Sequence, residues 1–130
     1  MASYADFDQS NFPLVTITFG AVKANEENFQ AYLDEMSRLY ERKEPLIIIF
    51  DATNATFPGI KYQQRQAKWL ADHRKTMETY CMGTAYVIPN DIIRTVLKAI
   101  FSLQQQPVPY EIFATPEGGL AWARSRLVSV

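Results

Sequence analysis

Hydrophobic residues change their spacing along the chain, and each spacing predicts one kind of element. Residues 4–9 predict a short strand, and residues 13–20 alternate between apolar and polar side chains, which predicts a second strand. The turn-forming residues 9–11 would join the two strands as an antiparallel hairpin. The strongest signal is the apolar run 45–50, which is typical of a central parallel strand that is covered on both faces.

Four longer segments carry apolar residues at steps of three and four, which predicts four amphipathic helices. The first follows an N-cap at Asn25 and runs to residue 43, and the second covers residues 60–80. The third follows an N-cap at Asn90 and ends near residue 104, and the last follows a cap at Thr115. The second helix is the most polar, and we expect its inner face to consist of Ile60, Ala67, Leu70, Arg74 and Met77.

Further strands are predicted at residues 83–88 and 110–114, between these helices. Strands that alternate with helices are joined by right-handed crossovers and form a mainly parallel sheet. The sequence therefore predicts an α/β fold that has a mixed, mostly parallel sheet of about five strands and about four helices. At 130 residues the chain suits one core, so we expect a single domain over residues 1–130.

Charge and cysteine content narrow the classes of partner. The formal net charge of −1 offers no overall field for nucleic acid, although residues 1–57 hold 9 acids and 4 bases and residues 58–130 hold 5 acids and 9 bases. Cys81 is the only cysteine, which excludes an internal disulfide and fits a reducing compartment. No stretch approaches the roughly 18 apolar residues of a membrane-spanning helix. The N-terminus also lacks a signal-peptide layout, so we expect a cytoplasmic protein without nucleic acid and without integral membrane contact.

Polar residues follow three of the predicted strands at what would be one edge of the sheet. Open α/β sheets bind ligands beyond the carboxyl ends of their strands, so this edge is the first candidate for a site. Alternatively, such side chains only satisfy the backbone of their own loops. The candidate residues of this edge are Asp51, Thr53, Asn54, Thr56, Asn90, Asp91 and Thr115.

A second candidate is a basic face on the predicted helix 60–80. It consists of Lys61, Arg65, Lys68 and Lys75, with Trp69 nearby, and could meet an acidic partner or a phosphate. The alternative is a solvated helix surface, because Asp72 interrupts the positive charge. The single histidine, His73, has no second ligand for a metal, and Cys81 has no evident base, so we expect a structural histidine and a buried thiol. We expect no metal, no other cofactor, no catalytic residue and no enzyme activity.

Several segments resemble a known family. They are Phe12-Pro13-Leu14-Val15, Ile49-Phe50-Asp51-Ala52, Gln66-Ala67-Lys68-Trp69-Leu70 followed by His73, Cys81-Met82-Gly83-Thr84-Ala85, and Phe113-Ala114-Thr115-Pro116-Glu117 followed by Ala121-Trp122-Ala123. Together with the order of elements, these segments resemble the STAS/SEC14 domain proteins, also called SpoIIAA-like, over nearly the whole chain. The resemblance implies a STAS-like fold.

The same resemblance implies two functions. In the anti-sigma-factor antagonists, the matching strand ends in an Asp-Ser-Ser-Gly type motif whose second serine is phosphorylated by a partner kinase. Thr53 stands at that place here, whereas Ala52 replaces the first serine and Asn54 replaces the glycine. In the SEC14-like branch, a related sheet and its helices enclose an apolar ligand such as a lipid, although this chain lacks the length for the additional helices of that branch.

Two function classes follow from these observations. The first is a non-catalytic regulatory module of a bacterial type that binds another protein, such as a kinase or an anti-sigma factor, through the edge around Thr53 and Asn54. The second is a carrier of a small apolar ligand, which would lie in a cavity between the sheet and the second and third helices. A homodimer is compatible with the many aromatic residues, but no apolar stripe requires one.

Overall fold

The structure, a computed structural model, describes residues 3–56 and 58–128 and contains one five-stranded sheet. Its strands lie side by side in chain order, with β1 antiparallel to β2 and all other neighbours parallel. This confirms the predicted mixed, mostly parallel sheet. The strands are β1 (Ala5–Asn11), β2 (Leu14–Phe19), β3 (Leu46–Asp51), β4 (Cys81–Val87) and β5 (Tyr110–Phe113).

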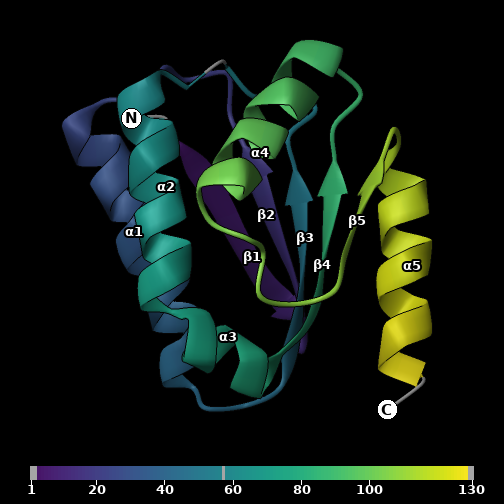
Figure 1. The fold of residues 1–130 in the computed structure, drawn as a ribbon. Helices are drawn as coiled ribbons and strands as arrows, with labels where there is room; N and C mark the ends of the chain where they lie inside the picture. Colours follow the sequence, from purple (N-terminus) through teal and green to yellow (C-terminus); the bar gives the residue numbers. More distant parts are fainter. Residues whose placement is uncertain (1–2, 57, 129–130) are drawn as a thin grey trace.

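Helices cover the two faces of the sheet unequally. Figure 1 shows α1, α2, α3 and α4 on one face and α5 alone on the other. Because both faces are covered, the parallel strands are shielded from water, as such sheets require. The helices are α1 (Glu26–Glu41), α2 (Ile60–Asp72), α3 (Arg74–Tyr80), α4 (Asp91–Leu103) and α5 (Pro116–Val128).

The central strand β3 contributes to two separate hydrophobic cores. Leu46, Ile48 and Phe50 belong to the core beneath α1, α2 and α4, whereas Ile47 and Ile49 belong to the core beneath α5. All five side chains are at most 6% exposed. The run 45–50 is therefore the doubly covered strand that its composition predicted.

The predicted helix caps at Asn25 and Asn90 are confirmed. Asn25 and Asn28 form a capping box in which each side-chain oxygen accepts a backbone N–H of the other residue, at 2.8 Å in both directions. Asn90 caps α4, because its Oδ1 accepts the backbone N–H of Ile92 at 2.8 Å. These asparagines satisfy donors that the first helical turn leaves without a partner.

The segment 60–80 differs from the prediction of one helix. It forms α2 and α3, which are separated at His73, where the backbone leaves the helical region with φ −111° and ψ 15°. The predicted inner face is also wrong at two residues, since Ile60 is 70% exposed and Arg74 is exposed. Ile60 lies at the very start of α2, and the break at residue 73 turns Arg74 to solvent, where it pairs with Glu78 at 2.9 Å.

The end of the first strand also differs from the prediction. Strand β1 continues to Asn11, so the hairpin turn lies at Phe12-Pro13 rather than at residues 9–11, and its peptide bond is cis. The Phe12 N–H donates to the carbonyl of Gln9 at 3.1 Å, and the register of the hairpin shifts between Asp8 and Asn11. This irregularity carries the chain past the turn-forming residues before it reverses.

We expect the doubly covered strand to dominate stability. Ile48→Ala should lower the free energy of unfolding by about 2–5 kcal/mol, and Ile48→Val by about 0.5–1.5 kcal/mol. The reason is that the Ile48 side chain is 0% exposed, so each smaller side chain leaves a cavity in the core. Urea unfolding measures both values. The control Thr18→Ala, at an exposed position of β2, should change stability by less than about 0.5 kcal/mol. A similar loss for Thr18→Ala and Ile48→Ala would contradict this account.

Candidate functional site

The predicted polar edge exists, but its side chains are occupied by local hydrogen bonds. The ends of β3, β4 and β5 are aligned, with Asp51 opposite Val87 and Val87 opposite Phe113. Asp51 Oδ1 accepts both the backbone N–H of Thr53 at 3.0 Å and its hydroxyl at 2.6 Å. This is the arrangement of an Asx turn, which satisfies its own loop.

Three other predicted residues of the edge also form hydrogen bonds with the backbone. The hydroxyl of Thr56 donates to the carbonyl of Val22 at 3.0 Å, and Thr115 Oγ1 accepts the backbone N–H of Gly118 at 3.2 Å. Asn90 acts as the cap described above, while the side chains of Asn54 and Asp91 are exposed. Helix α2 begins only at Ile60, so the turn at Thr53 does not lie at a helix N-terminus, where a phosphate would be stabilised.

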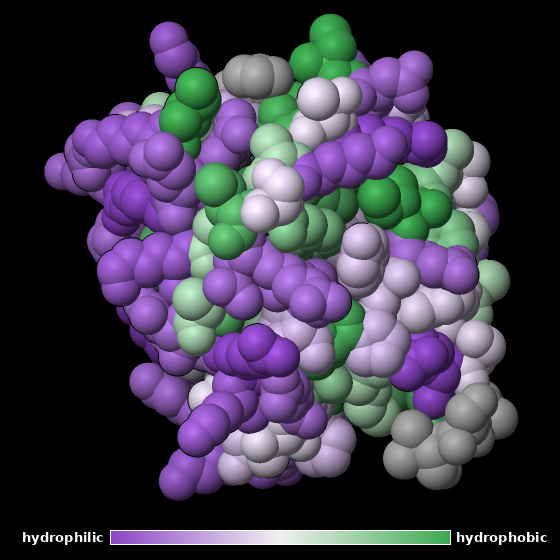
Figure 2. Space-filling view, in the orientation of Figure 1, coloured by the Kyte–Doolittle hydropathy of each residue, from purple (hydrophilic) through white to green (hydrophobic). Residues whose placement is uncertain are grey.

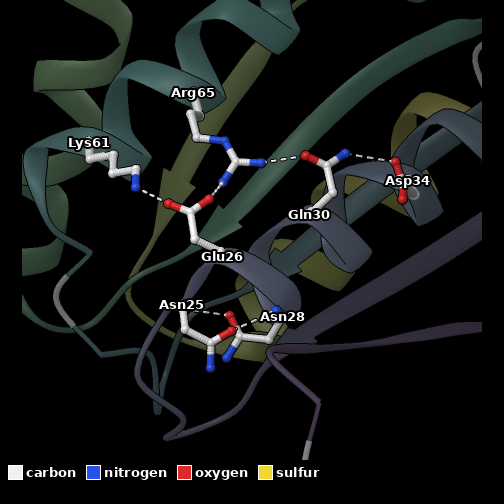
Figure 3. Close-up of polar contacts among 7 residues, drawn as sticks. All are labelled: Asn25, Glu26, Asn28, Gln30, Asp34, Lys61 and Arg65. Atoms are coloured by element: carbon white, nitrogen blue, oxygen red, sulfur yellow. Dashed lines mark hydrogen bonds and ion pairs between the residues drawn. The ribbon is translucent and has the colours of Figure 1, made fainter.

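The predicted basic face is largely neutralised by acids. Lys61 and Arg65 both bind the carboxylate of Glu26 on α1, and Arg65 also donates to Gln30 (Figure 3). Lys68 pairs with Asp72 at 2.8 Å. Of the four predicted cations, only Lys75 has no ion pair within the described residues. The contacts of Lys61 and Arg65 with Glu26 and of Arg65 with Gln30, here called the α1–α2 clasp, join the two helices.

A second link between the same helices involves His73. Its Nδ1 lies 2.9 Å from the carbonyl oxygen of Trp69, and its Nε2 lies 3.3 Å from the hydroxyl of Ser37 on α1. The indole N–H of Trp69 also donates to this hydroxyl at 3.1 Å, and the two rings stack with centroids 4.2 Å apart. The histidine thus joins helices, which is the structural role that was expected of it.

The single thiol is buried, as predicted. Cys81 is 7% exposed and donates to the carbonyl of Gly83 at 3.4 Å. Burial raises the pKa of the Cys81 thiol to about 11. Because a thiolate is the reactive form, this environment keeps the thiol unreactive at neutral pH.

An apolar cavity lies between the sheet and the helices α1, α2 and α4. Its volume is about 110 Å³. Partly exposed lining residues lie on α2, on α4 and in the loop 52–58, so the cavity approaches the surface along the line where these elements meet. Figure 2 shows hydrophobic side chains at the surface in this region, surrounded by hydrophilic ones. The lining includes Phe29, Tyr32, Met36, Ala55, Pro58, Tyr62, Leu70, Ile93, Val96, Leu97 and Phe101.

Aromatic rings from three neighbouring strands form the sheet side of this cavity. Phe19 on β2, Phe50 on β3 and Tyr86 on β4 all line it. Phe50 stacks on Tyr86 with centroids 5.0 Å apart and on Phe19 with centroids 6.2 Å apart. The register of the strands explains why the rings of Phe50 and Tyr86 stack, because the two residues lie directly opposite each other. Such a row of aromatic cross-strand neighbours is rigid and apolar.

The lining of the cavity is electrically neutral. Among the described residues, no Asp, Glu, Lys, Arg or His lines it. Burial raises the pKa of the Tyr32 hydroxyl well above its usual value and also raises that of Tyr86. Both phenols therefore remain protonated at physiological pH and serve as neutral hydrogen-bonding groups.

Three glutamines are among the residues that line the cavity. Gln63 and Gln66 come from α2, and Gln106 comes from the segment before β5. Gln63 is 7% exposed and Gln106 is 6% exposed. Both values are unusual for a residue type that is mostly found at the surface.

Sequence reasoning assigned these residues differently. None of the three glutamines was among the candidate site residues. One signal was present, because Gln63 stands four residues before Ala67 and seven before Leu70, on the inner face of α2. Of the seven residues predicted for the polar edge, only Thr56 lines the cavity as far as the structure describes it.

This arrangement of sheet and helices is a SpoIIAA-like α/β fold, as the resemblance implied. A solved structure of an uncharacterized protein from the DUF3478 family with a SpoIIAA-like fold, from Shewanella loihica PV-4, is similar to this chain with a TM-score of 0.65 and 14% sequence identity. The likeness covers 95% of this chain and 98% of that one. At this level of identity it establishes the fold and not an activity.

Comparisons of the sequence relate this chain to no protein family and to no curated protein. A scan against models of protein families finds no match, and a search of curated proteins finds none either. Within residues 3–56 and 58–128, no helix has the length and apolar character needed to cross a membrane.

We expect the α1–α2 clasp to contribute modestly to stability. Glu26→Gln should lower the free energy of unfolding by about 0.2–1 kcal/mol at low ionic strength, and most of this loss should disappear in 1 M NaCl, at about which concentration exposed ion pairs are screened. Urea unfolding at both salt concentrations measures it.

Glu27→Gln is the matched control for this experiment. Glu27 lies in the same first turn of α1, where it meets the same helix dipole, but forms no ion pair with another described residue. Equal losses for the two variants would assign the effect to the dipole rather than to Lys61 and Arg65.

Proposed function

We propose that this protein binds a small apolar molecule in the cavity between the sheet and the helices α1, α2 and α4. The observation that carries this proposal is an apolar cavity of about 110 Å³, because protein interiors usually contain few voids larger than a water molecule. The second function class named the sheet and the second and third predicted helices, the second over residues 60–80 and the third between Asn90 and about residue 104, as the location of such a cavity. Ligand sites are commonly apolar and aromatic cavities with a few well-placed polar groups.

The volume of the cavity limits the ligand. An apolar cavity of about 150 Å³ takes up benzene, so a cavity of this size suits a compound with one small ring, or the end of a longer molecule that projects between α2 and α4. The aromatic row of Phe19, Phe50 and Tyr86 offers flat, polarisable neighbours for such a ring.

Binding without catalysis is part of the same proposal. The residues that line the cavity provide amides and phenols but no nucleophile with a neighbouring base. The thiol of Cys81 and the ring of His73, which a reaction could use, both lie outside the lining.

The proposal predicts that filling the cavity abolishes binding. Toluene at about ten times its dissociation constant should stabilise the wild-type protein by about 1.4 kcal/mol, which raises Tm by roughly 4–7 °C. Val96→Phe places a ring in the cavity from α4 and should remove this rise, because Val96 is buried and lines the cavity.

Thr95→Phe is the control for this substitution. Thr95 is the exposed neighbour of Val96 on the same helix, so its variant should keep the response to toluene. Thermal unfolding monitored by circular dichroism measures all three proteins. If toluene leaves the Tm of the wild-type protein unchanged, the proposed function is wrong.

A second candidate is the protein-binding switch, which one observation favours. Thr53 is exposed at the end of β3, within reach of a modifying enzyme. Its hydroxyl, however, donates to Asp51, so a phosphate there would meet a carboxylate and open the turn by repulsion. In this hypothesis the opened turn, rather than a helix N-terminus, would change the binding surface for a kinase or an anti-sigma factor.

The switch hypothesis predicts opposite behaviour of two Thr53 variants. Thr53→Ala should retain a protein partner that Thr53→Glu loses, because only glutamate adds charge beside Asp51. Affinity capture from cells of the source organism, followed by quantitative mass spectrometry, compares the two. Identical captured proteins, together with an unphosphorylated Thr53 in the native protein, would exclude the switch.

A further inference from the structure

The three cavity glutamines differ in how far their amides are used. A glutamine side chain offers one acceptor oxygen and two donor hydrogens. Gln106 uses both of its ends, because its Nε2 donates to the hydroxyls of Tyr86 at 2.6 Å and Thr84 at 3.2 Å, and its Oε1 accepts the N–H of Val108 at 3.4 Å. Gln106 thus acts as part of the protein's own hydrogen-bond network.

Gln63 uses only one end of its amide. Its Nε2 donates to the carbonyl of Pro58 at 2.8 Å, and a carbonyl can only accept, so the amide oxygen must point the other way. This Oε1 finds no hydrogen-bond partner among residues 3–56 and 58–128. Because the residue is 7% exposed, the oxygen is an unused acceptor within a nearly buried side chain that lines the cavity.

Gln66 presents the complementary group. Its Oε1 accepts the hydroxyl of Tyr32 on α1 at 2.8 Å, which leaves the two hydrogens of Nε2 without a partner in the described part of the chain. Gln63 and Gln66 are three residues apart on α2 and are therefore neighbours on one face of the helix. Two glutamines that line the cavity from one face of α2 thus offer one unused acceptor and one unused donor.

We infer that the ligand of this cavity carries an uncharged polar group that both donates and accepts hydrogen bonds, and that Gln63 and Gln66 bind this group while the aromatic row contacts its apolar body. This inference rests on the proposed function and adds the class of ligand. A carboxamide, a lactam or a hydroxyl group meets the requirement.

The neutral lining excludes charged ends from this class. Placing a carboxylate or an ammonium group in an apolar site without a paired charge is strongly unfavourable. The nearest cation of α2 in sequence, Arg65, does not line the cavity and is held by Glu26 and Gln30 of the α1–α2 clasp. The unused amide groups of Gln63 and Gln66, in contrast, can form hydrogen bonds with a neutral partner without the cost of burying a charge.

The experiment compares three one-ring probes on the full chain: toluene, which has no polar group, benzamide, which has a neutral donor and acceptor, and benzoate, which has a similar shape with a charge. Dissociation constants come from titrations followed by NMR of the labelled protein. In the wild-type protein we expect benzamide and toluene to bind and to shift signals of cavity residues, and we expect no such shifts with benzoate.

Two variants test the two glutamines separately. Gln63→Leu removes the unused acceptor, and Gln66→Met removes the unused donor. Each substitution should weaken the affinity for benzamide about three- to tenfold, which corresponds to the loss of one hydrogen bond. Each should leave the affinity for toluene unchanged or higher. The variants disturb different contacts of the protein, with Pro58 and with Tyr32 respectively, so a shared effect on benzamide alone points to the ligand.

Gln64→Leu is the matched control, because Gln64 is exposed on the same helix and does not line the cavity. It should leave both affinities unchanged. The inference is overturned if toluene binds but each variant changes the affinities for toluene and benzamide equally. It is also overturned if toluene binds and benzoate binds as tightly as benzamide. In both cases the proposed function survives. If toluene does not bind the wild-type protein, the proposed function fails, and this inference, which rests on it, fails as well.

Discussion

Burial of β3 on both faces is the constraint on which the other parts of this structure depend. Its side chains alternate between two cores, so each face of the strand must be covered by helices. On one face α5 alone provides the cover and packs closely. A side-chain carbon at Gly119 would lie 2.9 Å from Val87 of β4, and Ala123 is 0% exposed, so small residues allow this helix to approach the sheet.

The opposite face is covered in a different way, and this difference creates the cavity. Large rings such as Phe50 and Tyr86 stand on the sheet, and three helices meet above them. The α1–α2 clasp and the hydrogen bonds of His73 hold α2 to α1 at its two ends. The helix is thereby held over the aromatic row without filling all the space beneath it, and its inner face carries glutamine where a tightly packed core would carry an apolar residue.

Much of the fold could be predicted from local patterns. The central strand, the caps at Asn25 and Asn90 and the parallel sheet follow from hydrophobic spacing and from residues with strong local preferences. The break at His73 could not be predicted in this way, because no glycine or proline marks it and its side chain bonds to Ser37 of a distant helix. The hairpin turn was also misplaced, since residues 9–11 favour a turn locally but continue β1 in the structure.

The candidate site differed more from its prediction than the fold did. By itself, the sequence determined which segments are strands and helices and where polar residues follow the strands, because these properties depend on neighbours along the chain. Only the tertiary structure decided that most side chains of the polar edge are engaged in hydrogen bonds, and that Gln63 and Gln66 line the cavity with amide groups that have no partner among the described residues. Burial and the choice of hydrogen-bond partners depend on residues that are distant in the chain. Spacing alone therefore placed Gln63 on the inner face of α2, but it could not show that this face lines a cavity.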